Sequence, residues 1–241
     1  MNNLKSTISQ VIEENLISTE WSDAVNTEVK NLNLNTNDHP RKDLTKVPFV
    51  TIDGADAKDF DDAVFCNLND SGFLLNVAIA DVAELVNEDS YLDQEAKKRG
   101  TSIYFPSKVI PMLPEKISNN LCSLVPDEIR NVLVSEINFS LDGSIKSYKF
   151  FQAKIMSHKR MTYAEVEEYV KNNNSNVSKK IKTSLDALNL LTKNLLVRRS
   201  QRKALEIEGN EPILSIDENG KVSSIDYHEG YMPIKWLKNP C

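Results

Sequence analysis

Apolar residues recur along the chain with two different periods, which predicts a mixture of helices and strands. In residues 4–16 and 21–32 every third or fourth position is apolar, as in amphipathic helices. Residues 90–100 predict a short helix, with Ser90 as its N-cap and Gly100 directly after its last turn. The chain is therefore expected to open with two helices and to carry a third near residue 95.

The carboxyl-terminal third predicts two more helices. Thr162 and Glu165 have the spacing of a capping box, which indicates that a helix starts there. A longer helix is expected from about Ile181 to the basic run of residues 198–203, where cations complement the helix dipole.

Strands are predicted where short apolar or alternating runs stand between turn residues. The predicted strand regions are 48–53, 63–68, 73–82, 131–157 and 212–226. Hairpin turns are expected at residues 69–72, at Asp142–Gly143 and at Asn219–Gly220. Three prolines exclude a continuous helix or a central strand from the first half of residues 101–124. The fold class is therefore α+β, with a curved mixed or antiparallel sheet and flanking helices.

Composition limits the class of protein. The chain has 241 residues, 40% of them apolar, which is enough for a real core, and a net charge of -6 argues against a broad basic surface. A local basic groove is compatible with that charge. The three cysteines have no CxxC spacing, so we expect free thiols, two of them buried. No signal peptide or membrane span is evident, and we expect a monomer in the cytoplasm.

An acidic segment, "TIDGADAKDFDDAVF", follows the first predicted strand and places five aspartates within ten residues. Crowded carboxylates raise one another's pKa and disfavour joint ionisation, so a cation is expected among them. An EF-hand does not fit, because the fifth and sixth residues counted from Asp59 are Ala63 and Val64. Mg²⁺ or Mn²⁺ with a phosphate ester suits the carboxylate oxygens better.

The chemistry that follows from this segment has two readings. Two ions about 3.5–4 Å apart would activate water and stabilise the leaving oxygen at phosphorus, which would be nuclease chemistry. A solvated acidic turn between two strands accounts for the same residues. The cluster by itself leaves both readings open.

The chain resembles the catalytic RNB domain of the ribonuclease R and ribonuclease II family, and ribonuclease R more closely, in "FVTIDGADAKDFDDAVF", "NVAIADVA" and "RGTSIYFPSKVIPMLPEKISNNLCSL". The likeness runs from about Val47 to about Asp226. It implies a processive, hydrolytic 3′-5′ exoribonuclease that degrades single-stranded RNA from its 3′ end to 5′-mononucleotides.

The resemblance also implies the site residues. The catalytic aspartates of the family fall on Asp53, Asp59, Asp61 and Asp62, and Asp56 lies outside that set. By analogy, the Mg²⁺ ligands are Asp53, Asp59 and Asp62. Asp61 would complete the site by orienting the metal or the attacking water.

Four further residues are candidates for RNA binding. Tyr104 matches an aromatic residue that packs against terminal nucleotides in the family, although a place in the core explains a tyrosine equally well. Lys159 and Arg160 form a local basic cluster, which we interpret as an RNA-facing strand end. A base contact is also considered for Tyr163, next to that cluster, although the capped helix start already explains the local pattern.

The resemblance divides the chain into three parts. Residues 1–46 are a helical lead-in and linker, residues 47–226 are the amino-terminal half of an RNB domain, and residues 227–241 match nothing in the family. The family continues into a helical half that supplies an arginine, a further acid and a second stacking aromatic. The alternative function is therefore a truncated, catalytically inactive fragment with at most weak metal or RNA binding.

Overall fold

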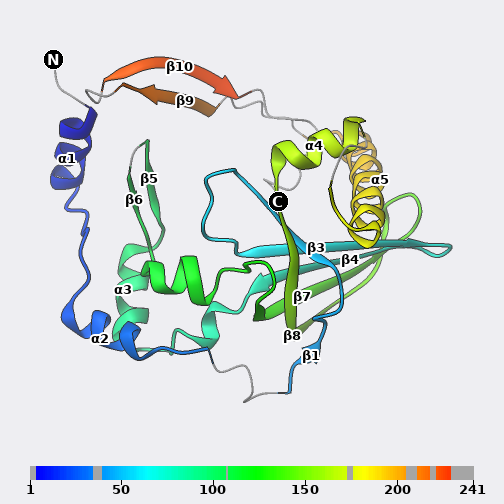
Figure 1. Cartoon of the computed structure of the whole chain (residues 1–241), viewed down its shortest axis with the longest axis horizontal. Helices are drawn as coiled ribbons and strands as arrows, with labels where there is room; N and C mark the ends of the chain where they lie inside the picture. Colours follow the sequence, from blue (N-terminus) through cyan, green and yellow to red (C-terminus); the bar gives the residue numbers. More distant parts are fainter. Residues whose placement is uncertain are drawn as a thin grey trace. The chain divides into compact units, whose positions relative to one another are not determined.

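Figure 1 shows a computed structural model of the chain, which describes residues 4–34, 40–106, 108–172, 176–204, 211–217 and 221–228. The helices are α1 (Leu4–Glu14), α2 (Asp23–Asn31), η1 (Val82–Glu84), α3 (Tyr91–Arg99), η2 (Lys116–Leu121), α4 (Tyr163–Asn172) and α5 (Lys179–Gln201). The strands are β1 (Lys42–Asp43), β2 (Phe49–Asp53), β3 (Asp62–Asn69), β4 (Gly72–Ala80), β5 (Ile103–Phe105), β6 (Lys108–Ile110), β7 (Ile129–Phe139), β8 (Ile145–Thr162), β9 (Glu211–Ile216) and β10 (Val222–His228). No helix in these ranges is both long enough and apolar enough to cross a bilayer.

The chain divides into two compact units. One draws its described residues from Met1–Leu32, Val86–Glu115 and Glu206–Tyr231, and it contains α1, α2, α3 and two separate two-stranded sheets, β5–β6 and β9–β10. The other contains the main sheet, α4 and α5. The predicted acidic segment lies entirely in this second unit.

Local sequence signals predict most elements correctly. Ser90 accepts a hydrogen bond from the Asp93 amide at 3.1 Å and caps α3, as expected. The predicted capping box of α4 forms in both directions: the Thr162 amide donates to Glu165 Oε2 at 2.7 Å, and the Glu165 amide donates to Thr162 Oγ1 at 3.2 Å. The hairpin of β9 and β10 is present, while its predicted turn, Asn219–Gly220, and most of residues 227–241 lie outside the described residues.

The main sheet is mixed and closes on itself. Its strand order is β1-β8-β2-β3-β4-β7, and β7 also pairs with β8. β8 pairs antiparallel with β7 along its first two thirds and parallel with β2 near its end. The five strands β8, β2, β3, β4 and β7 therefore form a continuous ring of hydrogen bonds. This confirms the predicted curved, mixed sheet and adds its closure.

β2 is buried on both faces of this sheet. Phe49 and Thr51 are fully buried on one face, while Val50 and Ile52 belong to the hydrophobic core on the other face. Because both faces are covered, the strand has little freedom to shift or rotate. Its last residue, Asp53, is therefore held on a rigid support.

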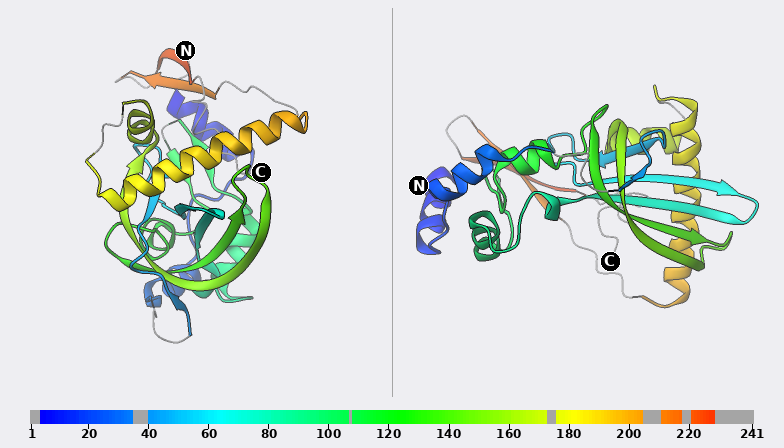
Figure 2. Two further views of the ribbon diagram at one scale, coloured as in Figure 1. Left: turned by 90° about the vertical axis from the view of Figure 1, so that its right-hand side faces the viewer. Right: turned by 90° about the horizontal axis from the view of Figure 1, so that it is seen from below.

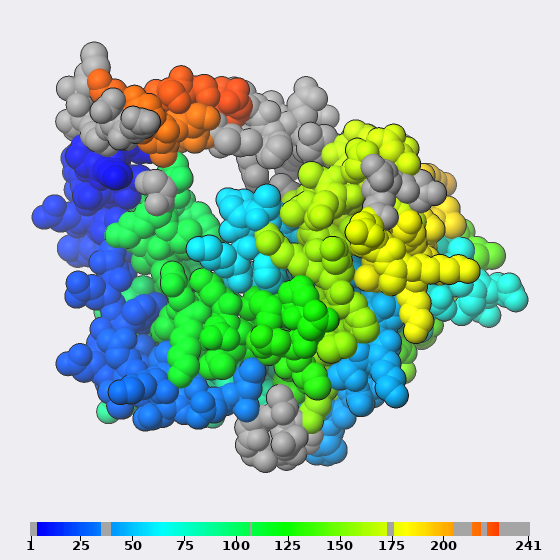
Figure 3. All heavy atoms as spheres, viewed as in Figure 1, coloured from blue at the N-terminus to red at the C-terminus, as the bar shows by residue number. Residues whose placement is uncertain are grey.

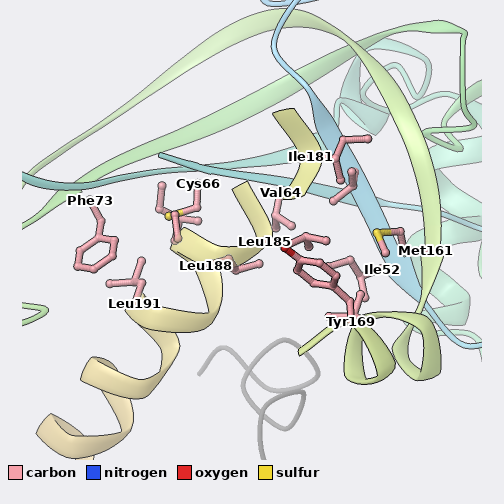
Figure 4. Packing of buried hydrophobic residues seen from close by; sticks show 14 of the residues in the cluster. Ile52, Val64, Cys66, Phe73, Met161, Tyr169, Ile181, Leu185, Leu188 and Leu191 are labelled. Carbon is pink, nitrogen blue, oxygen red and sulfur yellow. The ribbon is translucent and has the colours of Figure 1, made fainter. Parts of the chain in front are cut away.

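Helices α4 and α5 cover one outer face of the main sheet. α5 lies across the curved strands in both views of Figure 2 and supplies a row of buried side chains. Figure 4 shows Leu185, Leu188 and Leu191 packed toward Cys66 of β3 and Phe73 of β4. Cys66 and Cys122 are both free and buried, as predicted from the cysteine spacing. The core therefore lies between α5 and the strands that flank the acidic segment.

Gly72, at the turn between β3 and β4, provides a test of the fold. It has a φ of +131°, and a Cβ there would lie 2.0 Å from the carbonyl oxygen of Phe139 on the neighbouring strand. We expect Gly72→Ala to lower the free energy of unfolding by about 3 kcal/mol, from backbone strain together with the clash. Urea denaturation measures this loss.

The matched control is Gly100→Ala, because Gly100 also has a positive φ, +72°, but open space where a Cβ would be added. Strain alone should cost about 1–2 kcal/mol at that position. Equal losses for the two variants would contradict the role of the Phe139 carbonyl.

Candidate active site

The acidic residues gather where β2 ends and β3 begins. Asp53 is the last residue of β2 and Asp62 is the first residue of β3, while Asp59 and Asp61 lie in the connecting segment. We call this segment, residues 54–61, the acid loop, and the four aspartates the acid cluster. β2 and β3 are antiparallel neighbours, so the end of one strand and the start of the next share one edge of the sheet. In Figure 3 the light-blue acid loop region is at the surface beside the yellow-green end of β8.

Burial and mutual repulsion disfavour ionisation of Asp53, Asp61 and Asp62. Loss of solvent raises the pKa of Asp53 to about 6, with additional contributions from the charges of Asp61 and Asp59. Loss of solvent also raises the pKa of Asp62 to about 6, and the Asp61 and Asp53 carboxylates add to that effect. Asp61 is exposed at the surface, yet partial desolvation of its carboxyl group also raises its pKa. Each of these carboxyl groups is close enough to its neighbours for their charges to raise its pKa, so the groups lie in one small region.

The donor set fits a hard divalent cation. Oδ2 of Asp53 is buried and has no hydrogen-bond partner, so a carboxylate oxygen is available at the edge of the sheet. Carboxylate oxygens are the ligands that Mg²⁺ takes from proteins, usually one or two together with water and phosphate. Within the described ranges, no three His, Cys, Asp or Glu side chains are already arranged as a metal-binding group. The site thus offers individual carboxylates rather than a complete protein cage.

The candidate RNA-binding residues fall in different places. Tyr163, the first residue of α4, lies near the acid cluster, because the pKa of its hydroxyl is raised by burial and then by the charges of Asp53, Asp62 and Asp61. Lys159 is on β8 opposite Val50, and its charge adds to the hydrogen bonds from Thr162 that lower the pKa of Glu165. Tyr104 is on β5, in the other compact unit, and the residue is 69% exposed. The main sheet therefore brings Tyr163 to the acid cluster, and Tyr104 belongs to a separate two-stranded sheet.

Arg160 lies against the acid loop. It pairs with Thr51 across the parallel strands β8 and β2, and its Nη2 donates to three loop carbonyl oxygens. These are the oxygens of Gly54 at 3.1 Å, Ala55 at 2.6 Å and Ala57 at 3.4 Å. Contact with RNA remains a prediction for Arg160, and its hydrogen bonds to the acid loop are with the backbone.

Sequence reasoning missed a second set of contacts with the acid loop. Ser123 Oγ accepts a hydrogen bond from the Phe60 amide and donates one to the Lys58 carbonyl, both at 3.1 Å. The Leu124 amide donates to the Phe60 carbonyl at 2.7 Å. Ser123 lies near the end of the segment "RGTSIYFPSKVIPMLPEKISNNLCSL", which carries part of the family resemblance, and it is more than sixty positions from the loop. The resemblance marks this segment as part of the domain, but it gives no sign of a contact between Ser123 and the acid loop.

The raised pKa values predict a dependence of stability on pH. The folded state holds protons on Asp53 and Asp62 up to about pH 6, whereas aspartates of an unfolded chain lose theirs near pH 4. Between these values the folded state binds more protons, so these two groups make the free energy of unfolding fall as pH rises. We expect Asp62→Asn to gain stability relative to the unmodified chain from pH 4 to pH 6. Urea denaturation in EDTA at a series of pH values measures the difference.

Asp142 provides a control of opposite sign. Hydrogen bonds from Ser140 and Ser144 lower the pKa of this carboxyl group to about 2. Its ionised form therefore stabilises the fold, and the stabilisation disappears as pH falls from about 4 to about 2. Asp142→Asn should lose stability relative to the unmodified chain, with no further change between pH 4 and pH 6. A flat difference for Asp62→Asn over that interval would contradict the electrostatic account of the site.

Comparison with known proteins identifies relatives of the chain. Ribonuclease R of Vibrio parahaemolyticus is 42% identical over 221 residues, which cover 89% of this chain and 26% of the relative. Ribonuclease R of Escherichia coli is 54% identical over 127 residues, or 52% of this chain and 16% of the relative. The chain thus spans about a quarter or less of the length of these two relatives.

Solved structures show the same fold. The apo form of Mycoplasma genitalium RNase R superposes with a TM-score of 0.93 at 34% identity, over 99% of this chain and 38% of that one. The Dss1 exoribonuclease from Candida glabrata gives a TM-score of 0.76 at 19% identity, which supports the fold alone. A model of the RNB domain matches residues 41–232 of this chain. The chain therefore belongs to the RNB domain family.

Proposed function

We propose that the chain carries the metal-binding part of a hydrolytic exoribonuclease site, which removes nucleotides one at a time from the 3′ end of single-stranded RNA. The observation that carries the proposal is the acid cluster, four aspartates at the adjoining ends of two strands, one of them with a buried, unpartnered oxygen. Membership of the RNB family and relatives named Ribonuclease R support the reaction class. Solved complexes of Mycoplasma genitalium RNase R with RNA support RNA as the substrate.

In this proposal Asp53, Asp59 and Asp62 hold Mg²⁺, and Asp61 completes the site by orienting the metal or the attacking water. When bound, the cation supplies an activated water and neutralises charge on the phosphate. The side chains supply negative charge on a rigid edge of the sheet, so that the cation and the terminal phosphate need little reorganisation. The raised pKa of Asp53 and Asp62 fits this role, because a cation restores the ionised form of a carboxylate that burial disfavours.

RNA contacts are assigned to the aromatic and basic candidates. Tyr104 offers an exposed ring on which a base can stack without sequence preference. Tyr163 lies near the acid cluster and would contact the nucleotide next to the reacting phosphate. Lys159 and Arg160 add positive charge close to the acid cluster, which favours binding of a polyanion.

A cytoplasmic location and a monomeric state remain predictions from the sequence.

A second candidate is a chain that binds a metal ion or RNA without turnover. The chain covers 26% of the length of Vibrio parahaemolyticus Ribonuclease R, so the match does not carry the activity of that whole protein over to this chain. The same fold also occurs in yeast Ssd1, which is described as a pseudonuclease, at a TM-score of 0.62 and 18% identity. The fold alone therefore does not establish catalysis.

A labelled RNA distinguishes the two candidates. A 5′-labelled single strand incubated with the 241-residue chain and Mg²⁺ should give a ladder that shortens from the 3′ end. Asp61→Asn should reduce the rate at least about a hundredfold, because electrostatic groups at a reacting centre have effects of that size. The rate of ladder formation on denaturing gels measures this effect.

Asp56→Asn is the matched control, because it removes one charge from the same loop at a position outside the acid cluster. It should leave the ladder unchanged. Equal activity of the Asp61→Asn variant and the unmodified chain would refute the assignment of the acid cluster. Binding of Mg²⁺ without any shortening of RNA would instead support the second candidate.

A further inference from the structure

The acid loop depends on side chains from outside itself for its conformation. Residues 54–61 form neither helix nor strand, and one backbone hydrogen bond within the loop joins the Ala57 amide to the Gly54 carbonyl at 3.2 Å. The carbonyl groups of an irregular segment need other partners when they are withdrawn from water. In this loop, β8 and the residues that follow η2 provide them.

Arg160 holds the first half of the acid loop. One guanidinium nitrogen is shared by the carbonyl oxygens of Gly54, Ala55 and Ala57. The centre of the guanidinium also lies 4.9 Å from the centroid of the Phe60 ring, which is buried, so a cation–π contact connects it to the second half of the loop. A planar guanidinium presents its N–H groups in a fixed geometry and can stack on a ring, whereas a lysine ammonium is a compact charge on a flexible stem.

Ser123 holds the second half of the acid loop. Its hydroxyl group bridges the Phe60 amide and the Lys58 carbonyl, and only 1% of the residue is exposed. The residue that follows, Leu124, adds a backbone hydrogen bond to the Phe60 carbonyl. Phe60 is therefore held by backbone contacts on one side and by the Arg160 guanidinium on its ring.

We infer that Arg160 and Ser123 are positioning residues, which clamp the acid loop from two sides and thereby set where the carboxylates at its two ends point. The inference rests on the proposed function in one respect, that these carboxylates hold a divalent ion. Supporting residues of this kind orient metal ligands, and their loss typically weakens metal affinity about 10–100-fold. Arg160 acts on the site through the loop backbone, without a contact to the reacting atoms.

Amide hydrogen exchange, measured residue by residue by NMR on the 241-residue chain, tests the clamp without any ligand. In Arg160→Gln the Phe60 amide keeps its acceptor, Ser123 Oγ, so faster exchange there reports loosening of the loop. In Ser123→Ala the informative amide is that of Ala57, whose acceptor is the Gly54 carbonyl on the Arg160 side. We expect each of these two amides, in its variant, to exchange at least about tenfold faster than in the unmodified chain, as when a local hydrogen bond is lost.

Calorimetric titration with Mg²⁺ tests the consequence for the site. Arg160→Gln and Ser123→Ala should each weaken Mg²⁺ binding about tenfold or more. Arg160→Lys keeps the charge but loses the planar contacts, so it should resemble Arg160→Gln. Lys58→Gln removes a positive charge from the loop itself while its carbonyl contact remains, and it should leave both the exchange rates and the affinity unchanged.

The results separate the clamp from the proposed function. Unchanged exchange at Phe60 and Ala57, or faster exchange with undiminished Mg²⁺ affinity, would overturn the inference. If the unmodified chain binds no Mg²⁺, the proposed function fails, and the exchange rates alone decide whether the clamp exists. Slow exchange in the paired strands β4 and β7 shows that a variant is folded. If Arg160→Gln does not fold, Ser123→Ala is used to test the inference.

Discussion

The pairing of β8 with both β7 and β2 is the constraint on which the arrangement of the site depends. Its first part pairs antiparallel with β7, and its end pairs parallel with β2, so a single strand closes the ring. The parallel register sets Arg160 beside Thr51 and Thr162 beside Asp53. A shift of this register by one residue would turn the Arg160 side chain to the opposite face of the sheet. The acid loop would then lose its partner.

This arrangement holds carboxyl groups that repel one another on strands that have little freedom to move. β2 is buried on both faces, and α5 packs against β3 through a core that includes Leu185 and Leu188. The carboxyl groups of Asp53 and Asp62 therefore stay near each other, although burial and mutual charge raise their pKa values to about 6. The stability of the core offsets the electrostatic cost of holding these carboxyl groups together, and such a cost is common at functional sites. The positive charge of Arg160 acts in the opposite direction and lowers the pKa of Asp53.

Membership of the RNB family and the geometry of the acid cluster answer different questions. The family match and the superposition on RNase R establish the fold. The chemistry depends on individual residues, and the unpartnered oxygen of Asp53 is a more specific argument for a metal than the fold is. The clamp formed by Arg160 and Ser123 adds a further requirement, because carboxylates serve a metal only when the backbone that carries them is fixed.

The sequence by itself determined the local features: the helix starts at Ser90 and Thr162, the hairpin turns at residues 69–72 and at Asp142–Gly143, and the spacing of the aspartates. These follow from interactions over a few residues, which propensity and periodicity report. The closure of the sheet, the approach of Tyr163 to the acids and the contacts of Arg160 and Ser123 with the acid loop were decided only by the tertiary structure. They join segments some sixty to more than a hundred positions apart. Such contacts arise from which strands share hydrogen bonds and which faces are buried together, and no local pattern encodes that choice.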